Sequence, residues 1–107
     1  MNHESFEVVS EITGERYQVE FDWLQTAISL RHSDTVDVQF RVNGTGKVVA
    51  LPHAALQSAC RRAAIPLTDP LCRRIAAEHL RWALASGVDA ERDLLTLTPA
   101  QVEDRVA

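Results

Sequence analysis

The longest helical pattern in this chain is Asp69-Pro-Leu-Cys-Arg-Arg-Ile-Ala-Ala-Glu-His-Leu-Arg-Trp-Ala-Leu-Ala-Ser-Gly87. Asp69 suits the N-cap because its carboxylate can accept a hydrogen bond from a first-turn amide, and Pro70 fits the first helical position. Gly87 suits the end, because glycine takes the left-handed C′ conformation without steric cost. The pattern therefore predicts a helix over about 70–86, around which the rest of the chain must pack.

This helix has a wide apolar side. At 100° per residue, Leu71, Ile75 and Trp82 fall within one arc, with His79 near its middle. Leu80 and Leu84 lie beyond that arc, so the helix is apolar around more than half its circumference. It therefore needs a second contact surface, which could be the C-terminal helix, the segment 24–32 or another subunit. Our leading hypothesis is a homodimer interface that uses Leu80, Trp82 and Leu84.

Alternation of apolar and polar residues predicts strands in the first half of the chain. Residues 5–12 and 16–23 read as an antiparallel hairpin, with Tyr17, Val19, Phe21 and Trp23 on one face and a wet, acidic opposite face. Segments 35–42 and 47–51 read as a second hairpin, because Asn-Gly at 43–44 suits the positive φ angles of a type I′ turn.

Segment 24–32 is ambiguous. A strand would place Leu24, Thr26, Ile28 and Leu30 inward. A helix would instead place Trp23, Leu24, Ala27 and Ile28 inward. Leu30 fits the strand better, and Ser-Asp at 33–34 could turn the chain into the next strand, so the pattern favours a strand.

The second half of the chain is expected to be mainly helical. Pro52 opens a helix over about 53–65, residues 94–97 could be extended, and Thr98-Pro-Ala-Gln101 is a capping box that predicts a short helix over about 99–106. We therefore expect a single α+β domain over 1–107. Its antiparallel meander of four to five strands, at about 5–51, should be followed by helices that cover one face of the sheet.

The composition of the chain indicates where in the cell the protein is located. No apolar run approaches the roughly 20 residues that span a bilayer, and the start shows no signal-peptide pattern. The chain has two cysteines, too few for a disulfide framework. Only Lys47 is lysine among the 11 basic residues, and alanines are frequent, which suggests a GC-rich bacterial genome. We expect a bacterial cytoplasmic protein.

His79 is the first candidate for chemistry, because a buried imidazole needs partners for its ring nitrogens. The simpler interpretation is a structural histidine bonded to a backbone carbonyl or to a side chain of the sheet. Cys72, His53 and Cys60 suggest zinc together with His79, but each His–Cys pair is separated by seven residues. Seven helical residues rise about 10.5 Å, too far for one tetrahedral site, so we expect no metal and no cofactor.

A basic surface is the second candidate. It would consist of arginines from the two main helices, which are Arg61, Arg62, Arg73, Arg74 and Arg81. Nucleic-acid binding usually adds stacking aromatics and a less acidic chain, so we expect it less than a solvated, partly paired helix face.

The sequence thus predicts a non-enzymatic accessory or protein-interaction module that acts as a homodimer. The two alternatives are a nucleic-acid-binding protein that uses the arginines, and a small enzyme or metal-binding protein that uses His79.

Overall fold

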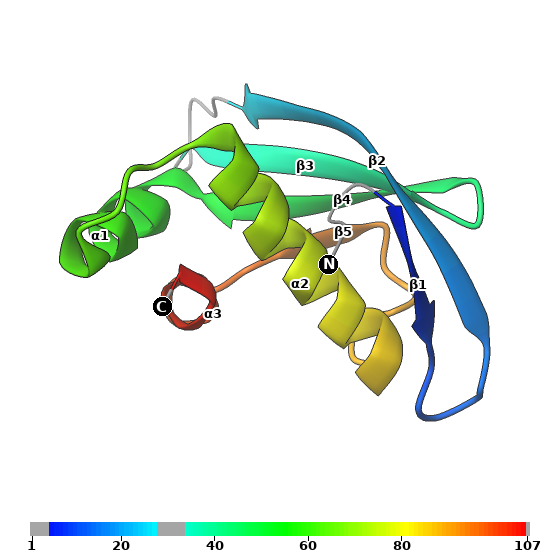
Figure 1. The fold of residues 1–107 in the computed structure, drawn as a ribbon. Helices are drawn as coiled ribbons and strands as arrows, with labels where there is room; N and C mark the ends of the chain where they lie inside the picture. Colours follow the sequence, from blue (N-terminus) through cyan, green and yellow to red (C-terminus); the bar gives the residue numbers. More distant parts are fainter. Residues whose placement is uncertain (1–4, 28–33, 107) are drawn as a thin grey trace.

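The computed structural model describes residues 5–27 and 34–106 and has an α+β fold, as predicted. Three helices lie on one side of a five-stranded sheet (Figure 1). The strands are β1 (Ser5–Val9), β2 (Arg16–Ala27), β3 (Thr35–Val42), β4 (Thr45–Pro52) and β5 (Leu94–Thr96). The helices are α1 (His53–Ala63), α2 (Asp69–Ser86) and α3 (Pro99–Val106).

The sheet follows the order β1-β2-β3-β4-β5. The first four strands form the predicted antiparallel meander, and β4 returns from β3 through the expected turn, with Asn43 at a φ of 51° and Gly44 at 84°. The fifth strand lies in the segment 94–97 that the sequence allowed to be extended. β5 runs parallel to β4, so its connection must pass through both main helices.

The strand β2 is longer than the predicted hairpin arm. It continues through residue 27, so the part of the ambiguous segment that the structure describes is strand, and residues 28–33 lie outside the described residues. A bulge interrupts its register: Phe21 is opposite Phe40, but Trp23 is opposite Gln39. The prediction that Trp23 shares a face with Phe21 is therefore wrong, because one extra residue reverses the alternation of all that follow.

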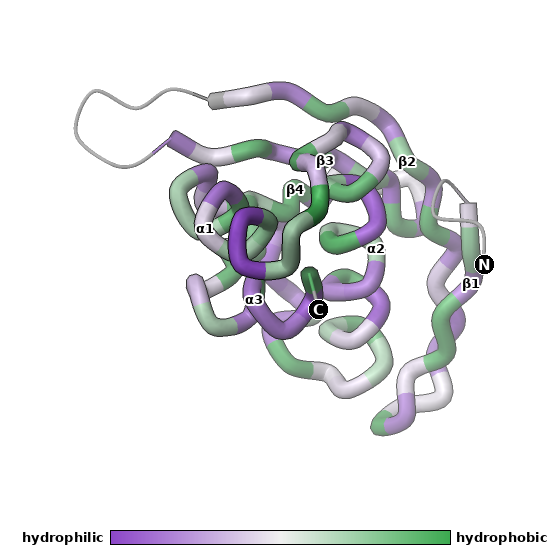
Figure 2. The backbone as a smooth tube through the Cα atoms, turned by 60° about the vertical axis from the view of Figure 1, so that its left-hand side comes forward, coloured by the Kyte–Doolittle hydropathy of each residue, from purple (hydrophilic) through white to green (hydrophobic). Residues whose placement is uncertain are grey.

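The two faces of the sheet differ in polarity. Apolar and polar residues alternate along the strands (Figure 2). On the face away from the helices, Glu7 accepts hydrogen bonds from Arg16 at 3.2 Å and Gln18 at 2.6 Å. Asp22 likewise accepts one from Gln39 at 2.8 Å. Cross-strand polar pairs of this kind fit a solvent-facing sheet surface.

The main helix α2 begins one residue earlier than predicted. Thr68 is its N-cap, and the Oγ1 atom of Thr68 accepts a hydrogen bond from the Leu71 amide at 3.3 Å. Asp69 lies in the first turn, where its negative charge interacts favourably with the helix dipole and stabilises the helix. Gly87 ends α2 in the left-handed conformation, with φ of 81°, as predicted.

The other two helices agree with prediction within two residues. α1 ends at Ala63 rather than 65, because Ala64 already has a left-handed φ of 57°. The capping box of α3 is formed: the Thr98 amide donates to Oε1 of Gln101 at 2.9 Å, and the Gln101 amide donates to Oγ1 of Thr98 at 3.2 Å. None of the helices in the described ranges has the length and apolar character needed to cross a membrane.

The core lies between the sheet and the helices. Phe40 and Val38 of β3 are completely buried, as are Ile75, Leu80 and Leu84 of α2. Burying a side chain of this size contributes on the order of 1.5–3 kcal/mol before the entropy of ordering is subtracted. The helix α2 contacts β1–β4 and also α3, so two layers of the same chain cover its apolar circumference.

Candidate ligand-binding cavity

A cavity of about 230 Å³ lies beside the second half of α2. Its walls come from α2, from the loop 87–93 that follows it, from β5 and from the first turn of α3. The lining residues are His79, Trp82, Val88, Asp89, Arg92, Leu94, Leu95, Thr96 and Gln101. Of the residues that the sequence singled out, His79 and Trp82 are brought to this cavity.

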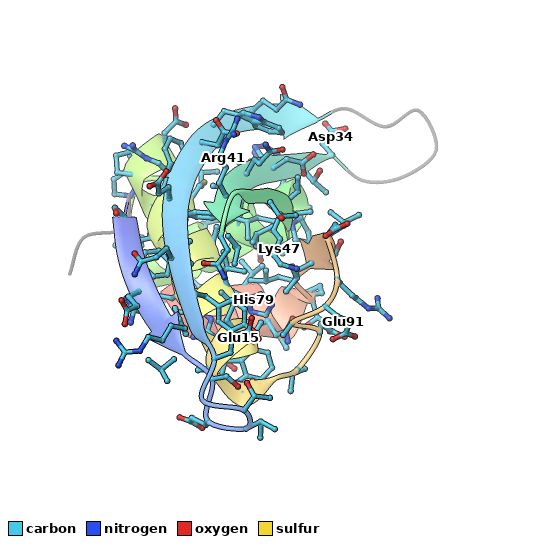
Figure 3. All side chains as sticks on the ribbon, turned by 90° about the vertical axis from the view of Figure 1, so that its right-hand side faces the viewer. Glu15, Asp34, Arg41, Lys47, His79 and Glu91 are labelled. Carbon is cyan, nitrogen blue, oxygen red and sulfur yellow. The ribbon has the colours of Figure 1, made fainter. Side chains whose placement is uncertain are left out.

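The loop wall is held by a lysine. Lys47 of β4 is 8% exposed, and its ammonium group donates to the carbonyl oxygens of Ala90 at 2.9 Å and Arg92 at 2.6 Å. Figure 3 shows Lys47 beside the loop that carries Glu91. The loop also contains Asp89 in the left-handed conformation, with φ of 56°, which aspartate tolerates better than most residues. The loop thus has a fixed path across the mouth of the cavity.

His79 forms part of the buried wall. Its side chain is 5% exposed, and its ring lies 5.4 Å from the Trp82 ring, centroid to centroid. The Nδ1 atom is buried and has no hydrogen-bond partner among the described residues. The sequence-based prediction that His79 is buried is therefore confirmed. The partner expected in a backbone carbonyl or a sheet side chain is not found for Nδ1 in the part of the chain that the structure describes.

The imidazole of His79 is neutral at pH 7. Desolvation, together with the positive charge of Arg105, lowers its pKa to about 4, whereas the negative charge of Asp89 acts in the opposite direction. A neutral imidazole has one N–H donor and one nitrogen acceptor. His79 can therefore give or accept a hydrogen bond, but it does not supply a positive charge.

The rim of the cavity contains exposed hydrophobic side chains beside polar and charged ones. Among the described residues, six large hydrophobic side chains are exposed, and three of these, Trp82, Val88 and Leu94, line the cavity. Their exposed fractions are 40%, 45% and 56%. Apolar side chains gathered around a concave site are typical of ligand-binding pockets.

The charged residues at the mouth are Arg92 and Asp89. The Nε atom of Arg92 lies 3.4 Å from Oδ1 of Asp89, and both side chains are more than half exposed. An exposed ion pair contributes little to stability, on the order of 0–1 kcal/mol. Both groups are therefore available to a ligand at small cost.

The proposed zinc ligands are not brought together at this site. Cys60 and Cys72 are free and buried, and neither of them nor His53 lines the cavity. Burial, with the charges of Asp69 and Cys60, raises the pKa of Cys72 to about 11, so its thiol is protonated at pH 7. Within residues 5–27 and 34–106, no three His, Cys, Asp or Glu side chains are grouped as metal ligands.

Four of the five arginines of the predicted basic surface contact a neighbouring side chain. Arg62 pairs with Glu103 of α3 at 2.8 Å, and Arg74 pairs with Glu78 at 3.2 Å. The guanidinium groups of Arg73 and Arg81 lie over the rings of Phe21 and Phe6, at 5.3 Å and 4.7 Å from the ring centroids. Arg61 is exposed on α1.

The three residues of the proposed homodimer interface differ in their exposure to solvent. Leu80 and Leu84 have exposed fractions of 0%, whereas Trp82 is 40% exposed. The sheet and α3 supply the second contact surface for α2. The two leucines therefore give no support to a homodimer interface.

Several residues in and around the cavity were not predicted as candidates. Asp89 and Arg92 lie in an aperiodic loop, and Gln101 was recognised only as a helix cap. Lys47 had a detectable signal, since it alternates in phase with Val49 and Leu51 and so occupies an inward-facing position of β4.

Comparisons of the chain with protein-family models, with curated proteins and with solved structures find no match. The function is therefore argued from the cavity itself.

Proposed function

We propose that this protein binds a small, partly apolar molecule in the cavity beside His79. The observation that carries the proposal is a buried imidazole nitrogen without a described partner, in the wall of a cavity with three exposed hydrophobic side chains around it. A buried polar atom that makes no hydrogen bond costs about 1–3 kcal/mol. A ligand that pairs with the imidazole would recover part of this cost.

The volume of the cavity limits the size of the ligand. Pockets for drug-sized molecules usually enclose about 300–1,000 Å³. At about 230 Å³, this cavity fits a smaller molecule, of which an apolar part would contact Trp82 and Leu94. The lining thus combines apolar side chains with polar and charged groups, so a ligand should have both an apolar and a polar part.

Binding fits the lining better than catalysis does. Covalent catalysis needs a nucleophile within hydrogen-bond reach of its base. Among the described residues, His79 forms no such bond with Thr96, the hydroxyl that lines the cavity. We therefore propose a binding protein, in agreement with the non-enzymatic role that the sequence favours.

We place this binding protein in the cytoplasm of a bacterium. The support is the pair of cysteines, which are free and buried, as expected in a reducing compartment, together with the composition of the chain. An accessory role through protein contacts would use the exposed side of Trp82 rather than Leu80 and Leu84.

The test is a fragment screen followed by protein-observed NMR. We expect fragments to shift the Trp82 indole and the amides of 88–96. The variant Leu94→Trp, which fills the mouth from an exposed position, should abolish the shifts. Val9→Trp is the matched control, since it adds the same bulk at an exposed position of the other edge strand. Fragment shifts that persist in Leu94→Trp, or a screen without hits in the wild type, would overturn the proposal.

A further inference from the structure

We infer that the ligand of this cavity is a small monocarboxylate, whose apolar body contacts Trp82 and whose carboxylate accepts hydrogen bonds from Arg92 and Gln101. This inference rests on the proposed function and adds the chemical class of the ligand. It is argued from the hydrogen-bonding capacity that the lining residues still have, and from the sign of the charge around them.

Gln101 offers a donor to the cavity. Its Oε1 atom accepts the hydrogen bond from the Thr98 amide at 2.9 Å that caps α3. This bond fixes the orientation of the side-chain amide, since its oxygen must face Thr98. The Nε2 group, which makes no hydrogen bond with any described residue, is then the group that a ligand acceptor can use.

Arg92 offers donors at the mouth. The ion pair with Asp89 uses its Nε atom, and no hydrogen bond or ion pair within the described ranges uses its two terminal nitrogens. Two such N–H groups match the two oxygens of a carboxylate. A cationic ligand would bind less well, because it would have to displace Arg92 from Asp89.

The charges that act on His79 also favour an anion. At the His79 imidazole, the charge of Arg105 acts more strongly than the opposite charge of Asp89. Lys47 adds a third cation close to the loop, where its ammonium lies 3.9 Å from Asp93 and is bonded to two loop carbonyls. Arg92, Arg105 and Lys47 are balanced in number by the three carboxylates of the loop, Asp89, Glu91 and Asp93. The preference for an anion therefore depends on the donors of Arg92 and Gln101 and on the stronger action of Arg105 at His79.

The experiment compares three ligands of the same shape and different charge. The variant Trp23→Phe leaves Trp82 as the only tryptophan, so that fluorescence reports on the cavity. Phenylacetate, phenylacetamide and phenethylamine are titrated in turn at pH 7. We expect phenylacetate to change the Trp82 emission with a dissociation constant at least about tenfold lower than those of the other two, because it alone makes charge-assisted hydrogen bonds with Arg92.

Two further variants test the assignment of the carboxylate. Arg92→Gln should weaken phenylacetate about tenfold and leave phenylacetamide unchanged. Arg16→Gln is the matched control, since Arg16 is also exposed and paired with one carboxylate, 3.2 Å away on β1. It should leave both affinities unchanged.

The outcomes separate this inference from the proposed function. If phenylacetamide or phenethylamine binds as tightly as phenylacetate, the carboxylate assignment is overturned and the cavity is still a binding site. If Arg92→Gln and Arg16→Gln weaken phenylacetate equally, the assignment to Arg92 fails. If none of the three ligands changes the emission of Trp82, the inference is wrong, and the fragment screen decides the proposed function independently.

Discussion

His79 shows how much of the environment of a single residue can be predicted from the sequence. Its place in the apolar arc of the main helix predicted burial, which the structure confirms. The pattern could not show that Nδ1 has no described partner, because partners come from elements far away in the sequence. The two charges that act on the imidazole, Arg105 and Asp89, lie in α3 and in the loop. Tertiary structure, not helical periodicity, makes this histidine distinctive.

The titration of His79 makes a residue-scale prediction about stability. The folded-state pKa of about 4 is below the usual value of 6.5, so the unfolded chain binds a proton first as pH falls. The stability that comes with a neutral His79 is fully present above pH 6.5 and is lost as the pH falls from 6.5 to 4. Between pH 7 and 4.5, the free energy of unfolding should therefore fall by about 2 kcal/mol more in the wild type than in His79→Leu.

Urea denaturation at several pH values measures this difference. The variant His53→Leu is the control, because it makes the same substitution at a histidine that does not line the cavity. At pH 7, His79→Leu should be as stable as the wild type or about 1 kcal/mol more stable, because a buried polar atom without a partner is removed. Equal slopes in the wild type and His79→Leu would contradict the assignment.

At the scale of elements, the sequence predicted the type of each segment better than its details. The capping signals correctly ended α2 at Gly87 and began α3 at Pro99. The bulge in β2 left only an indirect sign, since the predicted inward positions change from odd numbers up to Trp23 to even numbers from Leu24. The pattern alone could not distinguish a bulge from the end of the strand. The N-cap was assigned to Asp69 because it precedes Pro70, although Thr68 is an equally suitable residue type one position earlier.

Lys47 carries the prediction that belongs to this scale. Lys47→Met keeps most of the buried stem but removes the donor that two loop carbonyls share. We expect the free energy of unfolding to fall by about 2 kcal/mol, because hydrogen bonds to a charged group are worth about 1.5–3 kcal/mol. Urea denaturation measures the loss, and amide hydrogen exchange in the loop 87–93 should become faster.

The matched control is Arg41→Met on β3. Arg41 is also a cation on a strand, but it is 59% exposed at its side chain and pairs with Asp22 on the outer face at 3.4 Å. Its loss should change the free energy of unfolding by less than about 1 kcal/mol. If the two variants have the same effect, Lys47 does not hold the loop.

For the whole molecule, the sequence raised the question of what covers α2. The residues Leu80 and Leu84 widened its apolar side and suggested a second subunit, because the pattern alone cannot tell a neighbouring helix of the same chain from another copy. In the structure, α2 contacts the sheet and also α3, which is only eight residues long. So short a helix is marginal alone, and it is stabilised by docking.

Leu84→Ala tests this arrangement. Truncating a fully buried leucine should lower the free energy of unfolding by about 2–5 kcal/mol. Because the contact lies within one chain, the denaturation midpoint of wild type and variant should not change between micromolar and hundred-micromolar protein. Trp82→Ala, at an exposed position of the same helix, should cost less than Leu84→Ala. A midpoint that rises with protein concentration would instead indicate an interface between copies.

The parallel strand β5 has a consequence for how the protein is made. When the chain emerges from the ribosome, β4 is synthesised more than forty residues before β5, so its outer edge has no pairing partner during that time. An unpaired apolar edge is a template for association between nascent chains. The three residues of β5 close this edge, and with the same step they complete the wall of the cavity. The cavity is therefore complete only after the edge has been protected.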